Sequence, residues 1–226
     1  MTEQQSLRFW AFARGDIDPK DFESWFFEQA DLEAVLGHEL HFELLAADYR
    51  DERDTVPQLR KKIALFMEPK RKCECPKIRD MSAVPMGGDF YFEKVFESFL
   101  RETEFGHEKW WLYISTCAVC QTHWLIAQDD RIYDDFFMKR IDAQEVNDAK
   151  AGRWPPTFGT YENVLALGRK VSNPPRFFDK FAASLIWTVQ DLRKERSNIT
   201  ATEIAYLLGL SENHTARLLA EAEQRN

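Results

Sequence analysis

The sequence has few cysteines, no excess of positive charge and no long apolar run. Its formal net charge of −8 argues against a general binder of nucleic acid or anionic membranes, because such binders present a basic surface. No stretch approaches the roughly 18 apolar residues of a membrane span. The first residues, MTEQQSLRFWAFARG, lack the pattern of a secretion signal. We therefore expect a cytoplasmic protein whose four cysteines stay reduced and do not form disulfides.

Motifs of common enzymes are also missing. The sequence contains no glycine-rich phosphate loop, no nucleophile elbow, no paired-histidine metal motif and no convincing catalytic triad. Its histidines are scattered, and the two that lie three apart, His38 and His41, are flanked by acidic residues typical of a solvated helix face. We therefore predict that the protein is not an enzyme.

What the sequence does contain predicts an α+β fold that is mainly helical. Its aromatic content of 14% and its apolar content of 44% suffice for a real core. Residue patterns divide the chain into three regions: a helical domain over 1–70, a zinc-ribbon-like region with a β-hairpin over 71–152, and a helical region over 153–226 that ends in a helix-turn-helix-like motif.

Periodicity and turn residues predict the individual elements. Helices are expected over 18–29, 31–37, 38–49, 55–67, 90–106 and 175–195, and two more on either side of a turn at Gly209 within 201–223. Strands are expected over 109–116 and 123–128, and a loop over 81–89.

The cysteines fall into two close pairs, Cys73 and Cys75 in KCECP, and Cys117 and Cys120 in TCAVCQTHW. A thiolate pair across a tight turn is half of a tetrahedral zinc site, and cysteine sulfur is a favoured ligand of zinc. The two pairs together predict one structural Zn²⁺, with His123 as a weaker substitute ligand.

The cysteine pattern has three alternatives to a structural zinc. A thioredoxin-like redox pair should start a helix, whereas apolar strand-like sequence follows Cys120. A catalytic zinc needs an open coordination position, which four cysteines would close. Four unconnected buried thiols remain the third alternative, because cysteine buries readily as a small hydrophobe.

Acidic residues dominate the exposed positions of the predicted N-terminal helices: Asp16, Asp18, Asp21, Glu23, Glu28, Asp31, Glu33, Glu39, Glu43 and Asp48. One interpretation is a solvated helical face, and the other is a docking face for a cationic partner. Under the second interpretation Asp21, Glu23 and Glu33 are the candidate partner-binding residues.

The stretch ATEIAYLLGLSENHTARLLAEAE resembles the helix-turn-helix of bacterial regulators. Its expected core is Ile204, Ala205, Leu208, Leu218 and Leu219, with a sharp turn at Gly209 and a capping Ser211. Base-edge contacts would come from Asn213, His214, Thr215 and Arg217. Lysines and arginines, which would contact DNA phosphates, are scarce in this stretch. An ordinary packed helical hairpin that does not bind DNA tightly on its own is therefore favoured over a DNA-binding one.

Two stretches resemble known proteins. Residues 14–52, RGDIDPKDFESWFFEQADLEAVLGHELHFELLAADYRDE, resemble small helical domains of bacterial immunity proteins from polymorphic toxin systems, and residues 111–141 resemble a zinc-ribbon-like element. The first resemblance implies a non-enzymatic inhibitor that binds a cognate protein toxin. The acidic helices favour a basic toxin, and no contact with a membrane is expected. The alternative is a zinc-containing helix-turn-helix regulator that binds DNA, and only this alternative involves nucleic acid.

Overall fold

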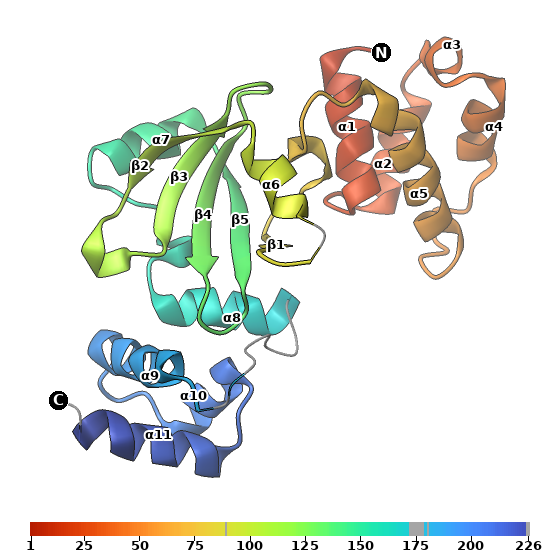
Figure 1. Cartoon of the computed structure of the whole chain (residues 1–226). Coiled ribbons are helices and arrows are strands. Elements are labelled where there is room, and N and C mark those ends of the chain that lie inside the picture. The colour runs from red at the N-terminus through yellow and green to blue at the C-terminus, as the bar shows by residue number, and fades with distance from the viewer. Residues whose placement is uncertain (89, 172–178, 180, 225–226) are drawn as a thin grey trace. The chain divides into compact units, whose positions relative to one another are not determined.

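The computed structural model describes residues 1–88, 90–171, 179 and 181–224 (Figure 1). Its contacts divide the chain into two compact units, Met1–Asp80 and Met81–Asn226. The described residues form many helices and one antiparallel sheet, so the predicted α+β, mainly helical class is confirmed. Among these residues, no helix combines the length and apolarity that crossing a bilayer requires.

The first unit is helical, as predicted. Its elements are α1 (Glu3–Arg14), α2 (Pro19–Phe27), α3 (Leu32–Leu36), α4 (His38–Ala46), α5 (Thr55–Met67) and two 3-10 turns, η1 (Glu68–Lys70) and η2 (Cys75–Lys77). Asp18 caps α2 by accepting a hydrogen bond from the amide of Lys20 at 2.8 Å, and Pro19 takes the first helical position. The stacked rings of Phe12 and Phe22, with centroids 4.0 Å apart, are fully buried in its core.

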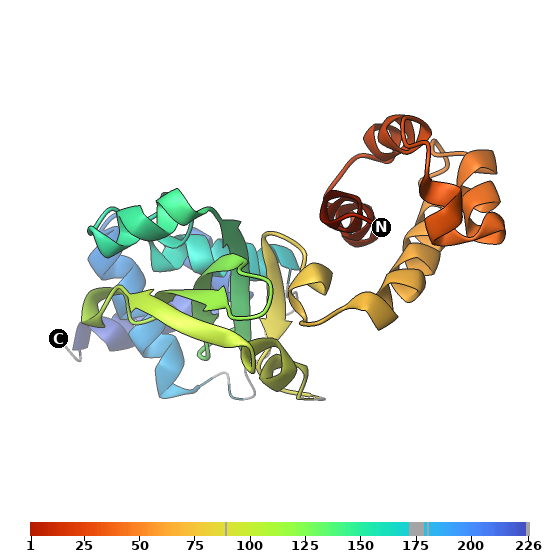
Figure 2. The same ribbon diagram turned by 90° about the horizontal axis from the view of Figure 1, so that it is seen from above.

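The second unit is built on a five-stranded antiparallel sheet in the order β1-β5-β4-β3-β2. Its strands are β1 (Ser82–Pro85), β2 (Phe99–Glu104), β3 (Leu112–Cys117), β4 (His123–Asp129) and β5 (Asp135–Ile141). The hairpin of β3 and β4 agrees with the two predicted strands, and its register runs from Leu112 opposite Ala127 to Thr116 opposite His123. Figure 2 shows α6 (Tyr91–Phe96) on the opposite side of the sheet from α7 (Ala143–Lys150) and α8 (Tyr161–Val171).

Two sequence-based predictions in this unit were wrong. The expected helix over 90–106 ends after α6, and the rest of it becomes β2, where the ring of Phe99 stacks on buried Trp124 with centroids 6.5 Å apart. The expected loop over 81–89 contains β1, which pairs with β5. Both segments become strands because other strands of the sheet supply their hydrogen-bond partners, β5 for β1 and the neighbouring β3 for β2, and this pairing overrides local propensity.

The C-terminal helices share a core with the sheet. They are α9 (Ala183–Glu195), α10 (Ala201–Leu208) and α11 (Glu212–Gln224), and the predicted helix over 175–195 lies partly outside the described residues. The hydroxyl of Tyr133 donates to the carbonyl of Leu207 at 2.5 Å, and Arg131 forms an ion pair of 2.6 Å with Asp191. One hydrophobic cluster therefore contains residues of both 71–152 and 153–226, two regions that the residue patterns had divided.

Gly168, in α8, provides a test of this core. A methyl group there would overlap the ring of Tyr133, which is fully buried. Alanine is the better helix former by about 1 kcal/mol, but overpacking a tight core costs about 1–3 kcal/mol. Because Tyr133 is also held by its hydrogen bond to Leu207, we expect Gly168→Ala to lower the free energy of unfolding in a urea titration. A gain in stability would contradict this packing, and Ala166→Gly on the exposed side of α8 controls for helix propensity.

Candidate metal centre

The turn between β3 and β4 brings two thiols close together. Cys117 is the last residue of β3, and its amide donates a hydrogen bond of 3.0 Å to the carbonyl of Thr122. The amide of Gln121 donates to the carbonyl of Cys117 at 2.9 Å, and Gln121 has a φ of 58°, in the left-handed region. The chain therefore reverses tightly around Cys120, which is the geometry expected from the Cys-x-x-Cys spacing.

A second tight loop carries the other two cysteines. Cys73 lies just before η2, and Cys75 is the first residue of η2. The ring of Pro76 restricts the backbone directly after Cys75. Arg14, on α1, donates a hydrogen bond to the carbonyl of Pro76 and so holds the loop from the side. Both thiols are buried.

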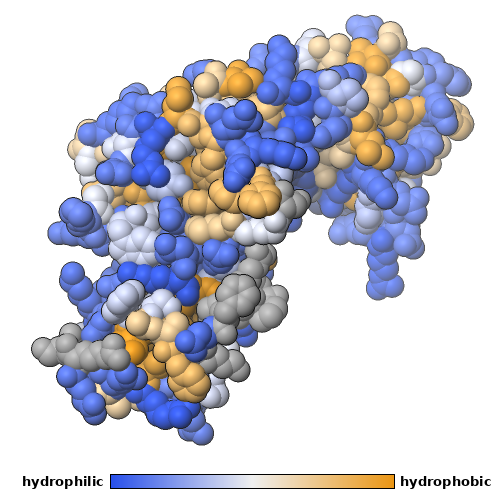
Figure 3. All heavy atoms as spheres, viewed as in Figure 1, coloured by the Kyte–Doolittle hydropathy of each residue, from blue (hydrophilic) through white to orange (hydrophobic). Residues whose placement is uncertain are grey.

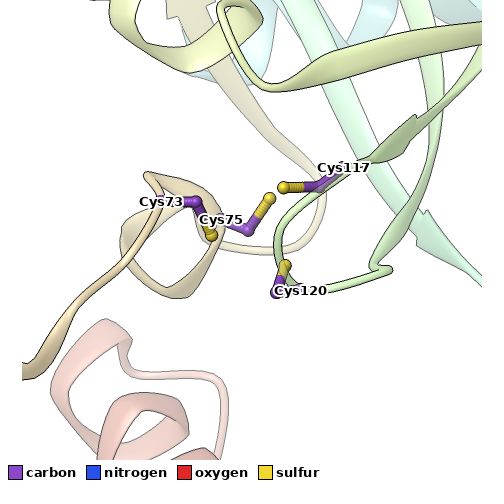
Figure 4. Close-up of side chains that lie close together, drawn as sticks. All are labelled: Cys73, Cys75, Cys117 and Cys120. Atoms are coloured by element: carbon purple, nitrogen blue, oxygen red, sulfur yellow. The ribbon is translucent and has the colours of Figure 1, made fainter.

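The four sulfur atoms converge on one point (Figure 4). Their Sγ atoms all lie within 4.8 Å of one another, and only Cys120 is exposed. All four cysteines are free thiols, so the closeness does not come from disulfide bonds. A tetrahedral ion with metal–sulfur bonds of about 2.3 Å requires sulfurs about 3.8 Å apart. The cluster is therefore close to the spacing that a tetrahedral metal ion needs.

Two hydroxyl groups lie against the hairpin sulfurs. The Oγ of Ser98 is 3.2 Å from the Sγ of Cys117, and the Oγ1 of Thr122 is 3.1 Å from the Sγ of Cys120. A thiolate has no proton to give, so each hydroxyl becomes the donor once its cysteine binds a metal. Such outer contacts orient metal ligands and tune their basicity.

Charged groups surround the Cys73–Cys75 loop. Arg71 forms ion pairs with Glu68, at 2.7 Å, and with Glu74, and it also donates to the carbonyl of Cys73 at 3.1 Å. The hydrogen bond from Arg71 lowers the pKa of Glu68, and the same bond raises the pKa of Arg71. Four thiolates around a divalent ion leave a net charge of −2, so the guanidinium beside the loop is electrostatically favourable.

His123, the weaker predicted ligand, is not part of the cysteine cluster. Its Nδ1 lies 2.7 Å from the Oγ1 of Thr116, its partner across the β3–β4 pair. The cross-strand hydroxyl therefore fixes the ring at a position that sequence spacing alone does not reveal.

The predicted acidic residues lie on α2 and α3, away from the cysteines in sequence. Asp21 and Glu33 are exposed, and Glu23 is half-buried. Glu33 accepts a hydrogen bond of 2.8 Å from His38, and this bond lowers the pKa of the Glu33 carboxyl. None of the three belongs to the cysteine cluster.

The C-terminal hairpin has the predicted shape. Gly209 has a φ of 66° between α10 and α11, and Ser211 Oγ accepts from the amide of His214 at 3.3 Å. The predicted core positions are buried, namely Ile204, Ala205, Leu208, Leu218 and Leu219.

The four candidate residues for DNA contact differ in their exposure to solvent. Asn213 and Arg217 are exposed, but Thr215 is fully buried and His214 is 8% exposed. The hydroxyl of Thr215 donates to the carbonyl of Ser211 at 3.2 Å. Two of the four side chains are thus buried, with the ring of His214 against that of Phe181, and this arrangement does not favour base readout.

Sequence reasoning missed the hydroxyl contacts of Ser98 and Thr122. A signal existed for Thr122, because a hydroxyl two residues after Cys120 can reach back across a tight turn. Ser98 gave none, since it approaches Cys117 only through the pairing of β2 with β3.

Comparisons with profiles of known families, with curated proteins and with solved structures find no match. The interpretation of the cysteine cluster therefore depends on its own geometry and on general coordination chemistry. The same holds for the acidic helices, whose resemblance to immunity proteins stays a prediction.

Proposed function

We propose that Cys73, Cys75, Cys117 and Cys120 bind one Zn²⁺ ion with a structural role. The support is the donor set: four thiols within 4.8 Å of one another suit a soft, tetrahedral ion. Four protein ligands leave no coordination position for a substrate, so this ion would stabilise the loop and the hairpin and would not act in catalysis. We propose that the chain itself is a binding protein and not an enzyme.

We further propose that the protein binds and neutralises a cognate, basic protein toxin. The observation that carries this proposal is the distribution of charge. Residues 16–48 contain ten acidic residues and one lysine, a formal charge of −9, whereas the rest of the chain has 28 acidic and 29 basic residues. One short segment of α2 to α4 thus accounts for the net negative charge of the protein.

Exposed apolar side chains accompany this charge. Phe27 is 56% exposed, Phe42 is 61% exposed and Leu45 is 41% exposed, all within the same acidic segment. Protein interfaces combine buried aromatic anchors with a polar rim, and a highly charged face without apolar residues would serve solubility alone. The combination supports a docking surface.

Charge reversal tests the proposal. The triple variant Asp21→Lys, Glu23→Lys, Glu33→Lys should slow association with a basic toxin domain that a pull-down from the native host recovers with this protein. Long-range attraction acts mainly on the association rate, so at low salt the rate should fall at least about tenfold, measured by stopped-flow fluorescence. Added salt should shrink the difference between variant and parent protein.

A matched control keeps the same change of net charge. Reversal of Glu93, Glu97 and Glu108, three exposed acids of the second unit, should leave the rate within about twofold of the parent value. Equal effects of the two triple variants would show that only net charge matters. If neither triple variant changes the association rate at low salt, the acidic residues of α2 to α4 serve solubility and not partner binding.

A further inference from the structure

Helices α3, α4 and α5 enclose an open groove of about 580 Å³. Its walls are formed by eight residues: Leu36, Gly37, His38, Glu39, Leu40, Glu43, Lys62 and Leu65. The groove belongs wholly to the first unit, so its shape is set by the packing of these three helices.

The groove is apolar at its base and at one edge. Leu36 is 6% exposed, Leu40 is half-buried, and Leu65 is 65% exposed although it projects from a packed helix. In Figure 3, orange hydrophobic spheres reach the surface of the N-terminal helices among blue hydrophilic ones. An exposed leucine beside a hollow with an apolar base is typical of a binding groove.

The charged groups of the groove favour a cation. Lys62 is the one lysine or arginine in the lining, and its ammonium is paired with Glu43 at 2.7 Å. His38 contacts Glu33 at 2.8 Å, and Glu39 is exposed. The sequence has no lysine or arginine between Lys20 and Arg50, so the α3–α4 wall carries acidic groups and no lysine or arginine.

We propose that this groove binds a cationic amphipathic helix of the partner, an inference that rests on the proposed function. Apolar side chains of that helix would contact Leu36, Leu40 and Leu65, and its lysines or arginines would lie near Glu39 and Glu43. Laying an amphipathic helix into an apolar groove is a recurrent mode of recognition, and the acidic wall selects a basic helix over an acidic one.

A defined peptide tests the groove without the toxin. The probe is a synthetic, fluorescein-labelled leucine–lysine helix of 18 residues, titrated into the full-length, zinc-loaded protein and followed by anisotropy. Leu65→Glu should weaken binding at least about tenfold although its carboxylate attracts lysines, because the leucines of the peptide lose an apolar contact and meet a charged group instead. Glu39→Lys should also weaken it, with a loss that shrinks as salt is added.

Leu7→Glu is the matched control, since Leu7 on α1 is 61% exposed and does not line the groove. This variant should bind the peptide like the parent protein. Equal losses for Leu7→Glu and Leu65→Glu, or equal binding of a leucine–glutamate peptide, would overturn the proposal. So would self-association of the parent protein that Leu65→Glu abolishes, because the occupant would then be a second copy of this chain.

The two proposals can fail separately. If the peptide binds in the groove but the chain does not neutralise a toxin, the groove chemistry holds and the immunity role is wrong. If the toxin is neutralised but Leu65→Glu leaves its capture unchanged, the docking surface lies elsewhere on the acidic helices.

Discussion

Cys75→Ser is expected to abolish zinc binding and to lower the free energy of unfolding by more than about 4 kcal/mol. Serine keeps the size of the side chain but replaces a soft thiolate with a hydroxyl that zinc does not favour. Cys75 is 1% exposed, so solvent does not offer a replacement ligand easily. Elemental analysis of protein purified without chelator should find about one zinc per parent chain and none in the variant.

Chelation separates this effect from simple loss of packing. Removal of zinc from the parent protein should lower its melting temperature to near that of Cys75→Ser, and chelator should not change the variant further. If chelator leaves the parent protein unchanged while Cys75→Ser is destabilised, the four cysteines are buried hydrophobes and not ligands. Iron in place of zinc would keep the site but correct the identity of the metal.

Ser98→Ala provides an intermediate case. It keeps all four thiols and removes only the hydroxyl that contacts Cys117 at 3.2 Å. Loss of an outer contact of this kind typically weakens metal affinity by about 10–100-fold without eliminating the site. The variant should therefore bind zinc, but yield it to a weaker chelator than the parent protein does.

The cysteine site could be predicted from sequence because its signal is local. Cys117 and Cys120 lie on either side of a turn between two strand-like runs, and the chain offers one other cysteine pair to complete four ligands. The signal for helix α2 was equally local, because Asp18 caps the helix and Pro19 occupies its first position. Gly209 marked the C-terminal turn for the same reason.

The missed features depend on strand pairing and helix packing, which local residue patterns do not determine. The residue pattern around Phe99 predicts the continuation of a helix, but the segment forms β2 because β3 provides its hydrogen-bond partners. His214 and Thr215 read as exposed positions of a recognition helix, but the packing of α11 on α9 and α10 turns them inward. Periodicity identifies an amphipathic helix but does not say how wide its buried face will be.

Asp129, at the end of β4, is a buried carboxylate that the sequence did not single out. It is 0% exposed and accepts hydrogen bonds from the amides of Arg131, Ile132 and Tyr133 at 3.1, 3.3 and 2.8 Å. The hydroxyl of Tyr161 adds a fourth bond at 2.7 Å. Burial raises the pKa of Asp129, and these four donors oppose that rise by stabilising the charged form.

Asp129→Ala is expected to lower the free energy of unfolding by about 3 kcal/mol or more, because each buried donor left without an acceptor costs about 1–3 kcal/mol. The loop from β4 to β5 and helix α8 should both loosen, since Asp129 connects the loop amides to Tyr161. Asp130→Ala, at the exposed neighbouring position, should change stability by less than about 0.5 kcal/mol. Urea unfolding of both variants measures the difference, and equal stabilities would show that the four hydrogen bonds contribute no net stability.

In a double-mutant cycle, Tyr161→Phe should destabilise the parent protein but have little further effect in the Asp129→Ala background, because the acceptor of its hydroxyl is already gone.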